Sequence, residues 1–273
     1  MPELPEVETT RRGLEPHVLQ RLVVDLVVRE RRFRLPVPAG LKRRLRGKRI
    51  VAIRRRAKYL LFDFEDCPGH LLIHLGMSGS LCVVNPDTPP RKHDHIDLVL
   101  EQGKALRFHD PRRFGLWTWI EESEETHALL AHLGPEPLLD AFSGDYLFER
   151  SRKRRCAVKT FLMDGRIVVG VGNIYAAESL FAAQIRPGRA AGRVTRAEYE
   201  DLAQHVVRIL QAAIEQGGTT LQDFVSGEGE AGYFAQELAV YGREGQECKR
   251  CGGTLKGKVL GQRASCYCPK CQK

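Results

Sequence analysis

RIVAIRRRAKYLLFDF, residues 49–64, is dominated by β-branched and aromatic residues, which indicates strand. Four more segments of this kind, broken by glycine, proline and Asn-Pro, lie at residues 22–28, 70–84, 95–103 and 105–121. Together they predict about five to seven short strands with short turns, an antiparallel β-sandwich. The segment EQG followed by KALRF predicts a hairpin within it.

Helical sequence precedes and follows this sandwich. Residues 5–19 predict one amphipathic helix. After the segment HLGPEPL the composition shifts to helix formers, which predicts a domain boundary near residue 134. The best-marked helix covers 195–216, where Thr195 and Glu198 form a capping box. We therefore expect a multidomain α+β protein, with an antiparallel β-sandwich domain in 1–133, a helical domain in 134–232 and a small module in 233–273.

Three further segments of the second half are rich in helix formers, at 145–155, 158–164 and 173–185. Residues 217–232, GGTTLQDFVSGEGEAG, are glycine-rich and polar, which predicts a mobile loop.

At 273 residues and 42% hydrophobic content, the chain is long enough for two domains and a small module. Its formal net charge of +9 suits a polyanionic partner, nucleic acid before an anionic membrane, although charge alone is weak evidence. No apolar run approaches the ~18 residues of a membrane span, and no signal peptide is recognisable. We therefore expect a cytoplasmic protein whose eight cysteines hold metal or remain free thiols.

The last thirty residues contain a metal-binding pattern. Two CxxC pairs, Cys248 with Cys251 and Cys268 with Cys271, predict one tetrahedral structural zinc ion that leaves no open catalytic position. Zinc should supply most of the folding free energy of this module, of order 10–16 kcal/mol apparent. A redox pair is the rival interpretation, and two such pairs in a basic hairpin disfavour it. The remaining cysteines are expected to be buried small hydrophobic residues: Cys67, Cys82, Cys156 and Cys266.

The N-terminal sequence MPELPEVE contains a candidate nucleophile. Removal of Met1 before Pro2 would leave a secondary amine that titrates far below lysine and is partly unprotonated at neutral pH. Its attack on a sugar aldehyde carbon would give an iminium ion, with Glu3 and Glu6 supplying carboxylates nearby. The alternative is that proline and acids merely open a helix, and this stretch alone favours that alternative.

Several cationic or glycine-rich features suit nucleic acid, and each has an ordinary structural alternative. Lys58 is expected in a strand, as a partly desolvated ammonium that donates a proton or as a snorkelling lysine. Arg263, near the tip of the basic hairpin 257–267, either binds phosphate or is solvated. The VGVGN turn at Asn173 is either an anion site or a glycine turn between helices. The cationic residues 152–155 either lie along a DNA backbone or form a solvated helix face.

Two turns carry large apolar side chains. HLGMSGS places Met77 between glycines, and HDPRRFG places Phe114 after two arginines at a proline turn. Side chains on such turns could enter a base stack once a nucleotide is extruded. Either residue, considered singly, is better explained as core.

With these residues assembled, the sequence resembles the formamidopyrimidine-DNA glycosylases, bacterial base-excision repair enzymes. The resemblance covers the whole chain in the family's order. Its motifs are MPELPEVETTRRGLEPH, RRAKYLL, HLGMSGSL, KHDHIDLVL, HDPRRFG, HLGPEPL, VVGVGNIYAAESLF, EQGGTTLQDF, GYFAQELAVYGR and the cysteine-rich end.

The resemblance implies a β-sandwich, a helix-two-turn-helix domain and a zinc-finger hairpin, with DNA in the cleft between lobes. It implies a monomeric, nucleoid-associated glycosylase and AP lyase that needs no cofactor besides one structural Zn²⁺. The implied partner is double-stranded DNA with oxidised purines, 8-oxoguanine or formamidopyrimidines, opposite cytosine. Excision would proceed through a Schiff base, with strand cleavage by β,δ-elimination.

Individual roles follow from the matching motifs. The resemblance makes Pro2 the nucleophile, Glu3 the adjacent acid/base, Lys58 the proton donor for β-elimination and Arg263 the residue for δ-elimination. It assigns DNA contacts to His93, Arg112, Arg154, Asn173 and Tyr241. Met77, Arg112 and Phe114 would fill the space that the extruded nucleotide leaves. Lys159 and loop 217–232 would lie near the everted base. Ser78 varies within the family and receives no role.

Two rival functions remain open. An endonuclease VIII-type glycosylase prefers oxidised pyrimidines, but typically begins PEGPE where this chain has PELPE. A non-enzymatic zinc-ribbon nucleic-acid binder would tolerate Pro2→Gly and would form no borohydride-trapped complex with damaged DNA.

Overall fold

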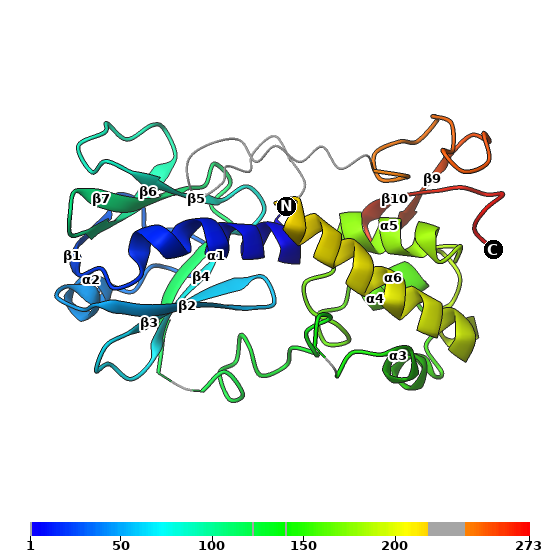
Figure 1. The fold of residues 1–273 in the computed structure, drawn as a ribbon, viewed down its shortest axis with the longest axis horizontal. Coiled ribbons are helices and arrows are strands. Elements are labelled where there is room, and N and C mark those ends of the chain that lie inside the picture. The colour runs from blue at the N-terminus through cyan, green and yellow to red at the C-terminus, as the bar shows by residue number, and fades with distance from the viewer. Residues whose placement is uncertain (1, 122, 140, 218–237) are drawn as a thin grey trace. The chain divides into compact units, whose positions relative to one another are not determined.

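The computed structural model describes residues 2–121, 123–139, 141–217 and 238–273. Contacts group the described chain into two compact units. The first is built from residues 2–131, and the second contains His132–Gln216 and the C-terminal residues from 238 onward (Figure 1).

The first unit is a β-sandwich with two helices. Its strands are β1 (Val23–Val28), β2 (Ile50–Arg56), β3 (Tyr59–Phe64), β4 (His70–His74), β5 (Ser80–Val84), β6 (Asp94–Leu100), β7 (Lys104–His109) and β8 (Leu116–Ile120). Its helices are α1 (Leu4–Val18) and α2 (Leu41–Leu45). The predicted sandwich is confirmed.

The strands form two four-stranded antiparallel sheets, with orders β1-β6-β7-β5 and β2-β3-β4-β8. The predicted hairpin is β6–β7, where Leu100 pairs with Lys104. Apolar side chains of both sheets and of α1 share one core, because alternate residues of each strand point inward. Members of this core include Val7, Leu14, Leu60, Phe62, Ile73, Ile96, Leu106, Phe108 and Trp117.

The chain passes from one sheet to the other at two turns that carry the predicted apolar side chains. Residues 75–79 connect β4 to β5, and residues 110–115 connect β7 to β8. Both turns are short, so the sandwich itself fixes where they begin and end.

The second unit contains α3 (Gly144–Ser151), α4 (Val158–Leu162), α5 (Asn173–Ala182), the short 3₁₀ turn η1 (Ala191–Arg193) and α6 (Arg196–Glu215). The predicted capping box of α6 is confirmed, with the Glu198 N–H donating to Thr195 Oγ1 at 3.3 Å and the Thr195 N–H donating to Glu198 Oε2 at 2.8 Å. Helix α6 packs against α3 and α5.

Several helix boundaries differ from the prediction, and two of them have a local cause. Helix α1 begins at Leu4, one residue early, because Glu3 is its N-cap. Helix α3 ends at Ser151, so residues 152–155 lie outside it. Arg152 explains this end, since its guanidinium stacks 3.8 Å from the Phe148 ring centroid and its Nε donates to the Phe148 carbonyl.

The C-terminal module is a hairpin of β9 (Lys256–Leu260) and β10 (Arg263–Tyr267), joined by Gly261 and Gln262 at positive φ of 53° and 61°. Its apolar residues join those of α5 in one cluster: Ala177, Phe181, Val240, Cys248, Leu255, Cys266 and Cys268. The module therefore packs into the same compact unit as the helices.

The prediction for the unpaired cysteines is partly wrong. Cys82 and Cys266 are buried as expected, but Cys67 is half-buried and Cys156 is exposed in the segment that follows α3. The predicted loop 217–232 lies, apart from Gly217, outside the described residues. Among the described helices, none has the length and apolar character to cross a membrane.

Candidate active site and zinc centre

Pro2 and Glu3 stand at the start of α1. Pro2 is buried, and Glu3 is only 1% exposed. The backbone N–H of Glu3 donates to Glu6 Oε2 at 2.8 Å. Because a helix N-terminus carries positive partial charge, both carboxylates are electrostatically favoured there. Met1, whose removal the sequence predicts, lies outside the described residues.

Lys58 lies in the two-residue turn between β2 and β3, not within a strand as predicted. Ala57 supplies the left-handed conformation of this turn, with φ of 54°. Arg55 holds the turn, since its Nη1 donates to the Ala57 carbonyl at 3.0 Å and its Nε donates to Glu8 Oε2 on α1 at 3.1 Å. The turn that presents Lys58 is therefore tied to the helix that begins after Pro2.

Glu8 is held as an anion by several arginines. Burial raises its pKa, but hydrogen bonds from Arg11 and Arg12 and the charges of Arg11 and Arg55 outweigh burial, so the pKa of Glu8 is lowered. Arg55 therefore keeps a charged partner at neutral pH.

His74 connects the Lys58 turn with the Met77 turn. It pairs with Tyr59 across β3 and β4, and its Nδ1 accepts the Gly76 N–H at 2.9 Å. Burial, followed by the positive charges of Lys58 and Arg34, lowers the pKa of His74 to about 3. A neutral ring can accept at Nδ1, so the hydrogen bond to Gly76 persists at neutral pH.

Met77 and Phe114 occupy turns rather than the core. Met77 is half-buried at residues 76–78, and Phe114 is 45% exposed. The Arg112 guanidinium lies 4.9 Å from the Phe114 ring centroid, a cation–π contact at the surface. Neither residue belongs to the core of the sandwich, so the core alternative fits neither.

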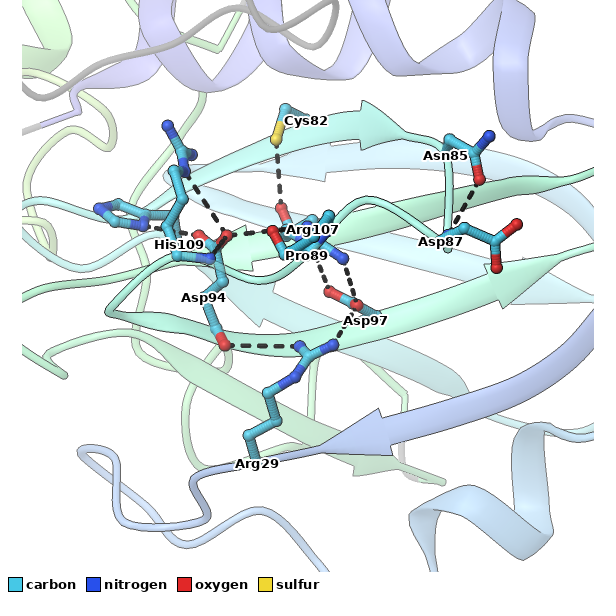
Figure 2. A network of polar contacts seen from close by, with 10 residues as sticks. Arg29, Cys82, Asn85, Asp87, Pro89, Asp94, Asp97, Arg107 and His109 are labelled. Carbon is cyan, nitrogen blue, oxygen red and sulfur yellow. Dashed lines mark hydrogen bonds and ion pairs between the residues drawn. The ribbon is translucent and has the colours of Figure 1, made fainter.

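His93 directly precedes Asp94, a member of the buried ionic network that Figure 2 shows. Its own φ is 81°, and its neighbour Asp94 accepts from the Arg91 backbone N–H at 2.8 Å and pairs with His109 Nδ1 at 2.8 Å. Burial raises the pKa of Asp94, yet these partners keep it below its ordinary value. Behind it, Arg107 donates to both carboxylate oxygens of Asp97 at 2.9 Å.

In the second unit, Asn173 begins α5 and is oriented by Lys159. The Lys159 ammonium is 1% exposed and donates to Asn173 Oδ1 at 2.7 Å, Ser265 Oγ at 2.8 Å and the Ala264 carbonyl at 3.1 Å. An ammonium only donates, so it fixes the Asn173 oxygen inward and leaves the amide NH₂ as the outward donor.

Tyr241 is oriented through its backbone by Glu178, a residue that the sequence interpretation missed. The Glu178 carboxylate accepts the N–H groups of Ala239, Val240 and Tyr241 at 2.8, 2.9 and 2.8 Å. A charged residue inside the apolar helix NIYAAESLFA was the signal that could have identified it.

Asn173 and Tyr241 line one cavity of about 540 Å³ between α5 and the hairpin. Its remaining walls come from the hairpin and the segment before it: Gly242, Glu244, Gly257, Lys258, Val259, Ala264, Ser265 and Cys266. Amide donors and Lys258 at such a cavity suit a phosphate group.

Arg263 and Arg154 are both exposed. Arg263 is the first residue of β10, directly after the hairpin turn, as predicted. Arg154 lies in the segment between α3 and α4, where its backbone bonds to Ser151 and Gly192 hold it. Both side chains are therefore accessible to a ligand from solution.

The four cysteines of the two CxxC pairs meet at one point. Their Sγ atoms all lie within 4.8 Å of one another, with 4.0 Å between Cys248 and Cys271 and 3.5 Å between Cys251 and Cys268. A tetrahedral zinc ion with Zn–S bonds of about 2.3 Å requires sulfur separations of about 3.8 Å. The donor set therefore fits one structural zinc ion.

The sequence-predicted residues thus form two sets. The first unit contains Pro2, Glu3, Lys58, Met77, His93, Arg112 and Phe114, and the second contains Arg154, Lys159, Asn173, Tyr241, Arg263 and the zinc cysteines. Polar partners that sequence reasoning did not identify hold members of both sets, among them the half-buried Arg55 and His74 and the buried Glu178.

Comparisons with known proteins identify three consecutive matches along the chain. Residues 1–117 match the formamidopyrimidine-DNA glycosylase N-terminal domain, 133–225 the H2TH domain of the same enzymes, and 245–273 the zinc finger found in FPG and IleRS. Formamidopyrimidine-DNA glycosylases of Methylococcus capsulatus and Stutzerimonas stutzeri are 56% and 58% identical over 273 residues, 100% of either chain.

Solved structures give the same result. MutM (Fpg) of Thermus thermophilus aligns with a TM-score of 0.89 at 39% identity, covering 99% of this chain and 98% of that one. Lactococcus lactis Fpg with DNA containing an abasic site aligns with a TM-score of 0.92 at 34% identity, covering 99% of each chain. Family models and full-length relatives thus agree, and the chain belongs to the formamidopyrimidine-DNA glycosylase family of base-excision repair enzymes.

Proposed function

We propose that this chain excises oxidised purines, 8-oxoguanine and formamidopyrimidines, from double-stranded DNA opposite cytosine, and then cuts the strand as an AP lyase. The observation that carries the proposal is the position of Pro2 and Glu3 at the N-terminal end of α1, beside the buried Glu6. The positive end of the helix disfavours a protonated amine, which raises the fraction of nucleophile at neutral pH.

The proposed reaction begins at the Pro2 nitrogen. Its lone pair forms a bond to C1′ of the damaged nucleotide, and the base departs with the electrons of the glycosidic bond and is protonated. The amine proton passes by way of Glu3 to the ring oxygen O4′, so the sugar opens as an iminium ion. The cationic adduct serves as the electron sink, as in other amine catalysts.

The iminium ion acidifies the neighbouring sugar protons. Loss of a C2′ proton expels the 3′ phosphate in β-elimination, and a second proton loss expels the 5′ phosphate in δ-elimination. Lys58, on its anchored turn, is proposed as proton donor for the first elimination, and Arg263 as the residue that serves the second.

DNA binding in this proposal uses both sets of residues. Asn173 and Tyr241 bind a phosphate at the cavity that they line, and the exposed Arg154 binds another phosphate. His93 and Arg112, on the sandwich, contact the duplex. Lys159 acts near the everted base chiefly by orienting Asn173. Met77, Arg112 and Phe114 fill the space that the extruded nucleotide leaves.

The protein is proposed to act as a monomer in the bacterial cytoplasm, at the nucleoid, with domain limits at 133/134 and 232/233. Four cysteine thiolates gathered for zinc support a reducing compartment. One structural zinc ion keeps the Arg263 hairpin folded against α5.

Oxidised pyrimidines are the second candidate substrate class. The observation in their favour is a solved complex of Lactococcus lactis Fpg, 34% identical, with DNA that contains an oxidised pyrimidine. The PELPE start of this chain favours purines.

Single-turnover excision on matched duplexes tests the proposal. One duplex carries 8-oxoguanine opposite cytosine, a second carries thymine glycol opposite adenine, and a third is undamaged. Faster release of 8-oxoguanine supports the purine assignment. A preference for thymine glycol would favour the second candidate, and binding without release of either base would favour a non-enzymatic binder.

A further inference from the structure

The turns that carry Met77 and Phe114 lie in direct backbone contact. Gly76 has a φ of 72°, and a Cβ atom there would come within 2.5 Å of the Phe114 carbonyl carbon and 2.6 Å of the Gly115 nitrogen. Only glycine allows this approach. These two of the three passages between the sheets therefore form one surface feature, which we call the paired turns (residues 75–79 and 110–115).

The buried side chain of Asp110 organises the second of the paired turns. It is 0% exposed, and its Oδ2 accepts the Gly115 N–H at 2.8 Å while its Oδ1 accepts the Arg112 N–H at 3.3 Å. These two bonds bracket Phe114. The backbone of Asp110 is held as well, because its N–H donates to the His93 carbonyl at 3.0 Å.

Ser78 links the first turn to this carboxylate. Its side chain is 3% exposed, and its Oγ donates to Asp110 Oδ1 at 3.0 Å. A carboxylate only accepts, so the serine hydroxyl must be the donor. Ser78 follows Met77 directly, so one hydrogen bond sets the position of Met77 relative to Arg112 and Phe114. Its hydroxyl points into the protein and is engaged there.

We propose that Ser78 and Asp110 are positioning residues for base extrusion: their hydrogen bond holds Met77, Arg112 and Phe114 in a single geometry before DNA binds. This inference rests on the proposed function. Side chains that are already ordered lose less conformational entropy when they enter the base stack. Removing the bond therefore slows the step in which the lesion leaves the helix. Cleavage at an existing abasic site, where no base has to be extruded, depends on it far less.

The test compares two substrates for each variant under single-turnover conditions. One duplex carries 8-oxoguanine opposite cytosine, and the other carries a preformed abasic site. Ser78→Ala removes the donor, and Ser78→Cys keeps nearly the same volume with a weaker donor. Ser80→Ala is the matched control, because it removes another buried hydroxyl from the same segment and leaves the Asp110 contacts in place.

For Ser78→Ala we expect the ratio of 8-oxoguanine excision to abasic-site cleavage to fall on the order of tenfold, the effect of one buried hydrogen bond to a carboxylate. Ser78→Cys should fall in the same direction, and Ser80→Ala should keep the wild-type ratio. Because Ser78 acts through Asp110, the double variant with Asp110→Asn should lose less than the product of the two single losses.

An unchanged ratio in Ser78→Ala would overturn the inference. So would an equal loss on both substrates, which would indicate general destabilisation, and melting temperatures of all variants identify that case. A wild-type protein that cleaves neither duplex would instead refute the proposed function, and this inference with it.

Discussion

The Glu8 carboxylate on α1 accepts a hydrogen bond from Arg55 Nε at 3.1 Å, and the same guanidinium donates to the Ala57 carbonyl at 3.0 Å. The helix that begins after Glu3 and the turn that presents Lys58 are therefore one piece of structure. The proposed reaction uses the Pro2 amine and the Lys58 ammonium at the same sugar, and it would gain from such preorganisation, since neither group has to be ordered during the reaction.

Arg55→Met should weaken that link. The Ala57 carbonyl loses the Arg55 hydrogen bond and Glu8 loses one of its charged partners, so we expect a destabilisation of about 1–3 kcal/mol and roughly tenfold slower abasic-site cleavage. Urea unfolding and single-turnover kinetics measure the two effects. Arg12→Ala is the control, because Arg12 also binds Glu8 but is 53% exposed. Equal effects of the two substitutions would contradict the role given to Arg55.

Lys58→Met should raise the pKa of His74. Burial lowers that pKa first and the Lys58 charge second, so removing the charge relieves part of the shift from about 3 toward the ordinary 6.5. Titration of the His74 ring by NMR in the variant and in Lys42→Met measures this, since Lys42 pairs with Asp25 and its charge does not contribute to the lowered pKa of His74. An unchanged His74 pKa in Lys58→Met would mean that the Lys58 and His74 side chains do not interact.

The same histidine gives the sandwich a pH dependence. Its folded pKa lies below the unfolded value, so between about 6.5 and 3 the unfolded chain binds a proton that the folded chain does not. Its contribution therefore lowers stability as pH falls through that window, with a slope of at most about 1.4 kcal/mol per pH unit. His74→Gln should flatten this part of the stability profile, and an unchanged slope would contradict the assignment.

Glu178→Gln should loosen the segment that carries Tyr241. Three backbone N–H groups share one carboxylate, and an amide offers only one acceptor oxygen, so we expect a loss of about 2–4 kcal/mol in stability. Binding to DNA with an abasic-site analogue should weaken as well. Glu200→Gln, on the exposed face of α6, is the matched control. Equal melting temperatures for the two variants would argue against the anchor.

Removal of zinc should release the hairpin that carries Arg263. Cys268 is fully buried within the cluster that packs on α5, so Cys268→Ser should cost both a ligand and part of that core. We expect loss of one equivalent of zinc, measured by a chromogenic chelator, together with loss of DNA binding. Cys156→Ser changes an exposed cysteine and should alter neither quantity. Retained binding after zinc release would show that the hairpin folds without metal.

Much of the architecture could be predicted from local sequence. The β-rich segments, the capping box of α6 and the paired CxxC knuckles each have a short-range physical cause, and the structure contains all three. The Lys58 turn could not be predicted, because it lacks such a local signal. Its left-handed residue is Ala57, without the usual glycine or asparagine, and the conformation depends on Arg55 from the preceding strand.

The candidate site was predictable only at its outer residues. Side chains at turns and helix starts, such as Phe114 and Asn173, are marked by neighbouring glycine and proline. The residues that hold them are distant in sequence. Asp110 accepts a hydrogen bond from Ser78, which is 32 positions away, and Glu178 accepts one from the Tyr241 N–H, which is 63 positions away. Such partners become visible only when the strands and helices have been assembled.

The direct test of the account concerns the atom that bonds to DNA. The protein is incubated with 8-oxoguanine duplex in borohydride, and the trapped complex is digested and sequenced by mass spectrometry. We predict a reduced adduct on the nitrogen of Pro2 in chains that have lost Met1. Attachment at a lysine, or full excision by chains that retain Met1, would contradict the central claim.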